Sequence, residues 1–262
     1  MLRSLFTSAT GLAAQQMNLD VVANNLANVS TTGFKSSRVE FQDLVYQNLR
    51  DPGAATGPGT SLPTGSQIGL GVSGGTTIPM QTQGTPQSTG NDTDLAISGN
   101  GFFAVQLPDG STGYTRAGSF STDSTGRLVT QEGYPIKPEI IVPPLHSSLS
   151  ISAEGTVSVQ QPGQQNATSV GAIQLTTFPN PSGLRAAGGA IFLQTNASGN
   201  PTTSKPGDQG AGGLRQHYVE ASNVDVVEEM VRMIVIQRAY DTNSKVIQSA
   251  DEMLATTNSI KR

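Results

Sequence analysis

Apolar residues recur every seven positions at both ends of the chain, and this periodicity constrains the fold more than any other feature. The row near the N-terminus consists of Leu5, Leu12, Leu19 and Leu26. The row near the C-terminus consists of Met233, Tyr240, Ile247 and Leu254. A sustained apolar heptad spacing is typical of helices that pack against other helices. We therefore predict a long helix at each end, and we expect these two helices to pack together.

The predicted N-terminal helix, over residues 2–29, carries almost no charge. Arg3 and Asp20 are the only charged residues before Gly33. A helix that faces water normally shows charged side chains on its polar face, so we expect this helix to have protein on several sides. Gly33 is a candidate left-handed residue that closes the helix, with Phe34 as the apolar contact behind it.

The predicted C-terminal helix has a stronger start signal. Ser222, Asn223 and Asp225 precede it, and the spacing of Ser222 and Asp225 resembles a capping box. Glu228 with Arg232 is an i,i+4 pair in the favourable order, and Asp241 with Lys245 is another. We expect this helix to keep one face toward water.

The middle of the chain predicts β structure. Short apolar segments separated by Gly, Pro, Asn and Asp indicate an antiparallel β domain over residues 91–199. Residues 34–90 and 200–222 are expected to form an extended connecting region. The predicted fold class is thus α+β. Residues 1–33 and 223–262 form a discontinuous coiled-coil layer, beside a central antiparallel all-β domain and a Gly/Pro-rich extended segment.

Composition excludes several classes of protein. The net charge is -4, and no basic stripe is present, which argues against a nucleic-acid partner. The chain has no cysteine, so disulfides and thiolate metal sites are excluded. No apolar run approaches the length of a membrane helix, and the N-terminus lacks the apolar core of a signal peptide. We expect no membrane insertion and no cleaved leader.

The motifs that suggest catalysis or cofactor binding lack their structural context. Gly69, Gly71 and Gly74 match the spacing of a dinucleotide loop, and Ser73 lies in a G-x-S-x-G match, but no helix pattern follows either. His146 and His217 are the only histidines. We predict that the chain is not an enzyme and has no catalytic, cofactor-binding or metal site. A periplasmic hydrolase that uses Ser73 is the weaker alternative.

Two terminal segments carry a family resemblance. Residues 23–35, here called the signature segment, and residues 222–254 resemble the two terminal blocks of bacterial flagellar rod and hook proteins. The signature residues are Asn24, Asn25, Leu26, Asn28, Gly33 and Phe34. Within this family the chain is most similar to the distal-rod type, on the basis of an insert at about 46–71 that includes Leu62, Pro63 and Gly65.

The resemblance implies a structural subunit of the flagellar basal body. It implies self-assembly through the terminal helices into a rigid helical tube that transmits torque and encloses an export channel, with the C-terminal helix lining that channel. Implied partners are copies of the chain, the proximal rod proteins, the hook protein and the hook-rod junction. The P- and L-ring proteins, the rod cap and the type III export apparatus are further implied partners. The implied location is the rod between periplasm and outer membrane.

Two alternatives remain open. The chain could be a proximal rod or hook subunit of the same family. It could also be a secreted β-rich binding module with a helical stalk. Because isolated helices of this length are marginal in water, we expect the terminal helices to be frayed in the free subunit and to order on assembly.

Overall fold

The computed structural model describes residues 2–53, 55–57, 60–61, 63–163 and 166–260. The chain forms two compact units, each assembled from segments that are distant in the sequence. The helical unit contains residues up to 26, residues 37–78 and residues from 225 onward. The β unit contains residues 27–36 and 79–224. Helices at both chain ends with antiparallel sheets between them confirm the predicted α+β class.

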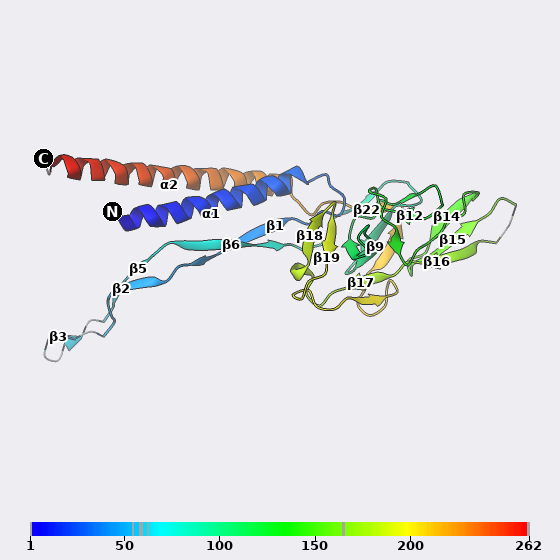
Figure 1. Cartoon of the computed structure of the whole chain (residues 1–262), viewed down its shortest axis with the longest axis horizontal. Helices are drawn as coiled ribbons and strands as arrows, with labels where there is room; N and C mark the ends of the chain where they lie inside the picture. Colours follow the sequence, from blue (N-terminus) through cyan, green and yellow to red (C-terminus); the bar gives the residue numbers. More distant parts are fainter. Residues whose placement is uncertain (1, 54, 58–59, 62, 164–165, 261–262) are drawn as a thin grey trace. The chain divides into compact units, whose positions relative to one another are not determined.

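The terminal helices of the helical unit are α1 (Leu2–Ala27) and α2 (Val226–Ile260). They run antiparallel and side by side (Figure 1). Asn25 Nδ2 donates a hydrogen bond of 3.1 Å to Glu229 Oε1. Farther along, a Cβ on Gly11 would lie 3.0 Å from Asn243 Nδ2. The same number of residues separates the two contact points on each helix, so the contact follows one continuous register. The predicted pairing of the terminal helices is confirmed.

The start of α2 differs from the predicted capping box. Asp225 is itself the N-cap, because its Oδ1 accepts hydrogen bonds from the backbone N–H groups of Val227 (2.8 Å) and Glu228 (3.1 Å). Ser222 lies outside the helix and accepts a bond from Val224 N at 3.3 Å. The predicted capping box of Ser222 and Asp225 was wrong, because Asp225 directly precedes the first helical turn and caps the helix itself.

The segment between α1 and the β unit forms one long two-stranded hairpin, here called the ribbon. Its strands pair as β1 with β6, β2 with β5 and β3 with β4. Their bounds are β1 (Ser37–Asp43), β2 (Tyr46–Arg50), β3 (Ala55–Gly57), β4 (Thr60–Ser61), β5 (Ser66–Gly69) and β6 (Val72–Pro79). The residues expected as an extended insert at about 46–71 therefore make the outer part of this hairpin.

The ribbon packs on α1 at a glycine. Gly71 has φ +111°, and a Cβ there would lie inside the contact distance of Thr10 Oγ1. The backbone N–H of Val72 donates to the same oxygen at 3.4 Å. Only glycine allows so close an approach at this backbone conformation.

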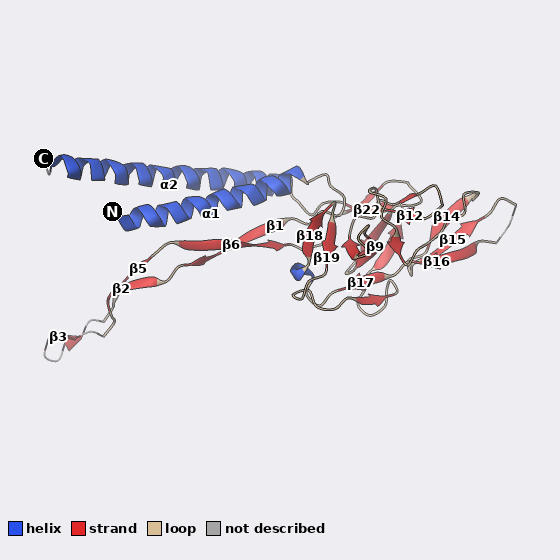
Figure 2. Cartoon of the chain, viewed as in Figure 1, coloured by secondary structure: helices blue, strands red, loops and turns tan. Residues whose placement is uncertain are grey.

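Strands and loops make up most of the β unit (Figure 2). One of its sheets has seven strands, in the order β18-β19-β10-β9-β17-β20 with β13 paired to β9. A three-stranded sheet, β14-β15-β16, and the pairs β7·β22, β8·β21 and β11·β12 complete the unit. The strands of the large sheet are β9 (Phe102–Gln106), β10 (Thr112–Thr115), β13 (Ile136–Lys137), β17 (Leu175–Thr177), β18 (Arg185–Gly188), β19 (Ile191–Leu193) and β20 (Thr202–Ser204). The others are β7 (Pro86–Ser88), β8 (Leu95–Ser98), β11 (Ser121–Thr122), β12 (Leu128–Val129), β14 (Ser148–Ile151), β15 (Thr156–Gln160), β16 (Thr168–Ala172), β21 (Gly213–Gln216) and β22 (Tyr218–Glu220). One 3₁₀ turn, η1, spans Pro181–Gly183.

Two apolar clusters fill the β unit. The larger includes Leu95, Phe103 and Leu175, which are fully buried. The smaller is aromatic, and its Tyr114 and Phe178 rings meet edge to face at 4.8 Å between centroids. Residues 200–222, expected in the connecting region, contribute β20, β21 and β22 to this unit.

Candidate functional site: the terminal helices and a buried ion cluster

The first half of α2 exposes an unusual amount of apolar surface. Val227 is 72% exposed and Val235 is 61% exposed. The other exposed apolar residues of this stretch are Val226, Met230, Val231, Ile234 and Tyr240. Contiguous exposed apolar surface on a folded protein marks a site of association. This part of α2 is therefore a candidate assembly surface.

The predicted leucine row of α1 is only half buried in the single chain. Leu5, Leu12, Leu19 and Leu26 are each partly accessible. The fully buried residues of α1 are Ser8, Val22 and Asn25. The packed face of α1 therefore consists of small and polar residues beside the leucines, and the leucines keep accessible surface for other contacts.

The predicted row of α2 shows the same offset. Met233, Ile247 and Leu254 are half buried, and Tyr240 is 40% exposed. The buried residues of α2 are Glu229, Ile236 and Ala250. These lie on a heptad row of their own, which Asn243 completes. Each terminal helix thus buries residues outside its predicted row within the subunit and leaves the predicted row partly accessible.

Asn25 of the signature segment joins the three parts of the helical unit. Its side chain is fully buried. Its Nδ2 donates to Ser37 O at 2.8 Å and to Glu229 Oε1 at 3.1 Å, and its Oδ1 accepts from Ser37 N at 2.9 Å. One amide therefore ties α1 to β1 and to α2. Asn24 is exposed and Asn28 is half buried.

Three buried charges meet in the β unit and form what we call the ion cluster: Lys35, Arg116 and Glu220. Lys35 Nζ lies 2.5 Å from Glu220 Oε1, and Arg116 Nη1 lies 3.1 Å from Glu220 Oε2. All three side chains are at most 5% exposed. The carboxylate therefore links the end of the signature segment to the residue that follows β10.

Backbone groups complete the cluster. Lys35 Nζ donates to Thr82 O at 2.7 Å, and Arg116 Nη2 donates to Gly99 O at 2.8 Å. Glu220 Oε1 also accepts from Gly84 N at 2.9 Å. Because burial disfavours the charged forms, the pKa of Lys35 and the pKa of Arg116 are both lowered, and the Glu220 carboxylate opposes the shift in each case.

Gly33 sits beside the ion cluster in a conformation that only glycine adopts without strain. Its φ is +70°, and a Cβ would clash with the backbone of Arg116 and Ala117. Its N–H donates to Glu220 O at 2.8 Å. Gly33 therefore brings the signature segment against the C-terminal strand β22, and Phe34 beside it is half buried.

The insert residues have different surroundings. Pro63 is exposed at the outer part of the ribbon, and a Cβ on Gly65 would lie 2.7 Å from Arg50 O. Gly65 therefore lies so close to the opposite strand of the hairpin that a side chain there would clash with it. Leu62 lies outside the described residues.

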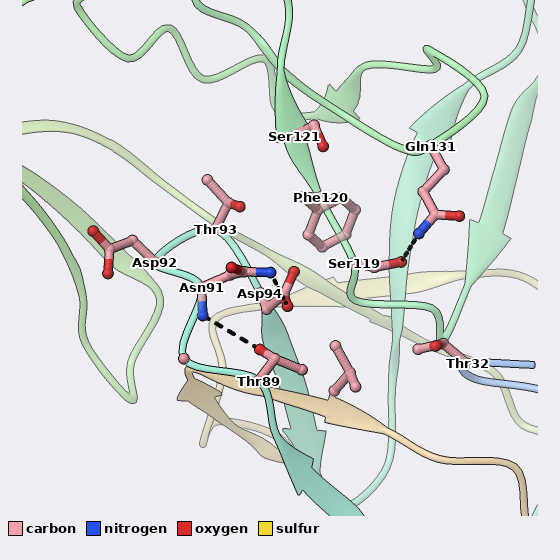
Figure 3. Close-up of a pocket in the computed structure, with 12 residues that line it drawn as sticks. Thr32, Thr89, Asn91, Asp92, Thr93, Asp94, Ser119, Phe120, Ser121 and Gln131 are labelled. Atoms are coloured by element: carbon pink, nitrogen blue, oxygen red, sulfur yellow. Dashed lines mark hydrogen bonds between the residues drawn. The ribbon is translucent and has the colours of Figure 1, made fainter. Parts of the chain in front are cut away.

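The β unit contains a polar hollow with a volume of about 680 Å³. Figure 3 shows Asn91 and Asp94 facing each other there, with Nδ2 donating to Oδ2 at 3.1 Å. Across the hollow, Gln131 Nε2 donates to Ser119 Oγ at 3.2 Å. Within the part of the chain that the structure describes, no three His, Asp or Glu residues gather as a metal site would require. The hollow offers hydrogen-bonding groups without a nucleophile and base in contact.

The hydrolase alternative also lacks its geometry. Ser73 lies inside strand β6 rather than at a sharp turn between a strand and a helix. His146 Nδ1 is 2.9 Å from Pro143 O, and His217 Nδ1 is 3.2 Å from Asn91 O. Both histidines are thus held by backbone carbonyls.

Comparison with known proteins identifies the family. Residues 5–35 match the model for flagella basal body rod proteins, residues 96–159 match the D1 domain of flagellar hook proteins FlgE/F/G, and residues 215–260 match the C-terminal region of flagellar basal body rod FlgEFG proteins. The chain is 47% identical to the flagellar basal-body rod protein FlgG of Caulobacter vibrioides, over 99% of this chain and 100% of that protein. The chain belongs to the flagellar basal-body rod protein family.

Other FlgG proteins of this family agree. The protein of Buchnera aphidicola subsp. Schizaphis graminum is 50% identical over 97% of this chain and 98% of its own length. The protein of Bacillus subtilis is 41% identical over the full length of both. The chain is accordingly a structural rod protein and not an enzyme.

The rod family gives the ion cluster a clear place in the chain. Lys35, Arg116 and Glu220 each lie in a different one of the three family-matched segments. The sequence analysis did not single out any of the three as part of a cluster, because nothing in sequence spacing reveals that the three charges meet. Among the described residues, no helix is long and apolar enough to cross a membrane.

Proposed function

We propose that this chain is a distal rod subunit, which assembles through its terminal helices into a rigid helical tube around an export channel. The observation that carries the proposal is the apolar surface of the helical unit. The exposed valines and methionine of α2 and the half-buried leucine row of α1 leave apolar area that a second copy would cover. Burial of that area provides the free energy of assembly.

The ribbon favours the distal type over the proximal and hook types. Its outer strands expose Tyr46, Leu49 and Ile68. An isolated two-stranded hairpin is marginal in water, so neighbouring subunits would stabilise it and in turn be held rigidly. A straight tube that transmits torque needs such contacts between subunits.

The proposed partners follow from this place in the flagellum. They are copies of the chain, the proximal rod proteins, the hook protein and hook-rod junction, the P- and L-ring proteins, the rod cap and the type III export apparatus. The proposed location is the rod between periplasm and outer membrane.

Assembly of the purified chain tests the proposal. We expect axial tubes in electron micrographs, and we expect Ile247→Asp or Leu12→Asp to abolish them, because a charge buried between subunits is costly. Ser249→Asp is the matched control, since this exposed residue lies on the opposite side of α2 from Ile247. The thermal transition of the β unit should stay unchanged in all three variants. Tubes formed normally by Ile247→Asp would contradict the proposal.

A further inference from the structure

A groove runs between α1, α2 and β1 within the helical unit. Its volume is about 410 Å³. Its apolar lining consists of Val21, Val22, Val39, Val231, Val235 and Ile236. Val231 is 55% exposed and Val235 is 61% exposed, so the groove continues into the exposed apolar surface of α2. It is large enough to hold a phenylalanine side chain.

Arginines stand at the rim of this groove. Arg38 and Arg232 line it, and their side chains are 52% and 49% exposed. Arg38 pairs with Glu40 and Arg232 pairs with Glu228, at 2.5 Å and 2.6 Å. A guanidinium is attracted to the face of an aromatic ring. The groove therefore suits an apolar aromatic side chain better than an aliphatic one.

The same unit carries an aromatic side chain with no cover. Phe6 of α1 is 71% exposed, whereas the seven other phenylalanines are buried or half buried. Phe6 lies on the side of α1 opposite the buried Ser8. Exposure of the phenylalanine ring to water is unfavourable, so covering it with another apolar surface would lower the free energy.

Phe6 cannot fill the groove of its own chain. It precedes Val22 by 16 residues on α1, which corresponds to about 24 Å at about 1.5 Å per residue. A phenylalanine side chain spans only a fraction of that distance. An apolar protrusion and a matching groove at different places on one chain make a head-to-tail contact, which propagates as an open polymer.

We propose that Phe6 of one copy inserts into the groove of the next copy. This inference rests on the proposed self-assembly and names one contact that drives it. The knob is Phe6, the socket is the groove between α1, α2 and β1, and the arginines of the rim flank the ring. Because Phe6 and the groove lie at different positions on the chain, each copy contacts one neighbour through its Phe6 and a different neighbour through its groove.

Disulfide trapping tests the contact, because the natural chain has no cysteine. We expect the variant carrying Phe6→Cys and Val235→Cys to give a ladder of cross-linked oligomers when assembled tubes are oxidised. A bond inside one chain is excluded. In the antiparallel register Val235 faces a position about 13 residues from Phe6 along α1, or roughly 20 Å, and a disulfide needs Cα atoms within about 7 Å.

The control pair is Phe6→Cys with Leu145→Cys, since Leu145 is 78% exposed but lies in the β unit. It should give no ladder. Tubes that form from the Phe6–Val235 cysteine variant without a ladder would overturn the knob and socket but leave the proposed function standing. Failure of the unmodified chain to form tubes would overturn the proposed function itself.

A complementation experiment decides the case in which the cysteine variant does not assemble. Phe6→Ala empties the socket, and Val235→Trp fills it from within. Each alone should raise the critical concentration for assembly about tenfold or more, whereas the double variant should assemble better than either. Leu145→Trp, at a residue 78% exposed in the β unit, is the control and should leave the critical concentration unchanged. Additive losses in the double variant would overturn the contact.

Discussion

The β unit and the helical unit bury their apolar residues in opposite ways. The β unit has a cluster of fully buried side chains such as Leu95, Phe103 and Leu175. Among its described residues only Ile141 and Leu145 are large, apolar and exposed. In the helical unit, α2 alone exposes nine large apolar side chains. One unit is complete within a single chain, and the other is completed by further copies.

The two units also place their buried charges differently. The ion cluster of the β unit surrounds one carboxylate with two cations and with backbone donors. In the helical unit, Glu229 is 5% exposed, its Oε1 accepts from Asn25, and its Oε2 has no hydrogen-bond partner. Arg116 Nε of the ion cluster also lacks a hydrogen-bond partner. The two buried carboxylates differ, however, because Glu220 is bonded through both of its oxygens and Glu229 through only one.

Removing the central carboxylate of the ion cluster should lower the free energy of unfolding of the β unit. Glu220→Ala leaves Lys35 and Arg116 buried without a counter-charge, which we expect to cost about 3–5 kcal/mol in the free energy of unfolding. Urea unfolding followed by near-ultraviolet circular dichroism measures this. Lys35→Met is the comparison variant, because it removes one of two cations and keeps the Arg116–Glu220 pair. Equal losses in the two variants would refute the assignment of Glu220 as the centre.

Truncating Asn25 should have a smaller effect, confined to the helical unit. Asn25→Ala leaves Glu229 and the backbone of Ser37 without their partner, at a cost of about 1–3 kcal/mol. We expect a higher critical concentration for assembly and an unchanged unfolding transition of the β unit. Asn24→Ala, at an exposed neighbour, is the control. A shift of the β-unit transition by Asn25→Ala would show that the two units are not separate in stability.

The sequence predicted those parts of the fold that depend on apolar periodicity. The heptad rows predicted both terminal helices and their pairing. They did not predict which row packs inside the chain, because Ser8, Asn25 and Glu229 carry no apolar signal. The ribbon was expected only as an extended segment, since its Gly- and Pro-rich strands lack regular alternation. The helix α2 begins after Asp225 rather than after Ser222. Both are good capping residues, and only the backbone geometry decides between them.

The ion cluster shows a different limit. Lys35 and Glu220 are separated by 185 positions, and each reads alone as an ordinary charged residue. Their meeting depends on the backbone conformation of Gly33, which brings the signature segment onto β22. The sequence marked Gly33 as the left-handed residue that closes the first helix. Its φ is left-handed, but α1 ends at Ala27 and Gly33 instead approaches β22, a partner that follows only from the tertiary fold.

Amide hydrogen exchange on free and assembled chain tests the central claim most directly. The claim is that the β unit is complete alone and that the helical unit is completed by assembly. We expect amides of residues 5–28 and of α2 to exchange rapidly in the monomer and slowly in the tube, because isolated helices of this kind are marginal. Amides of β9 and β10 should be protected in both. Strong protection across residues 5–28 in the monomer would contradict the account.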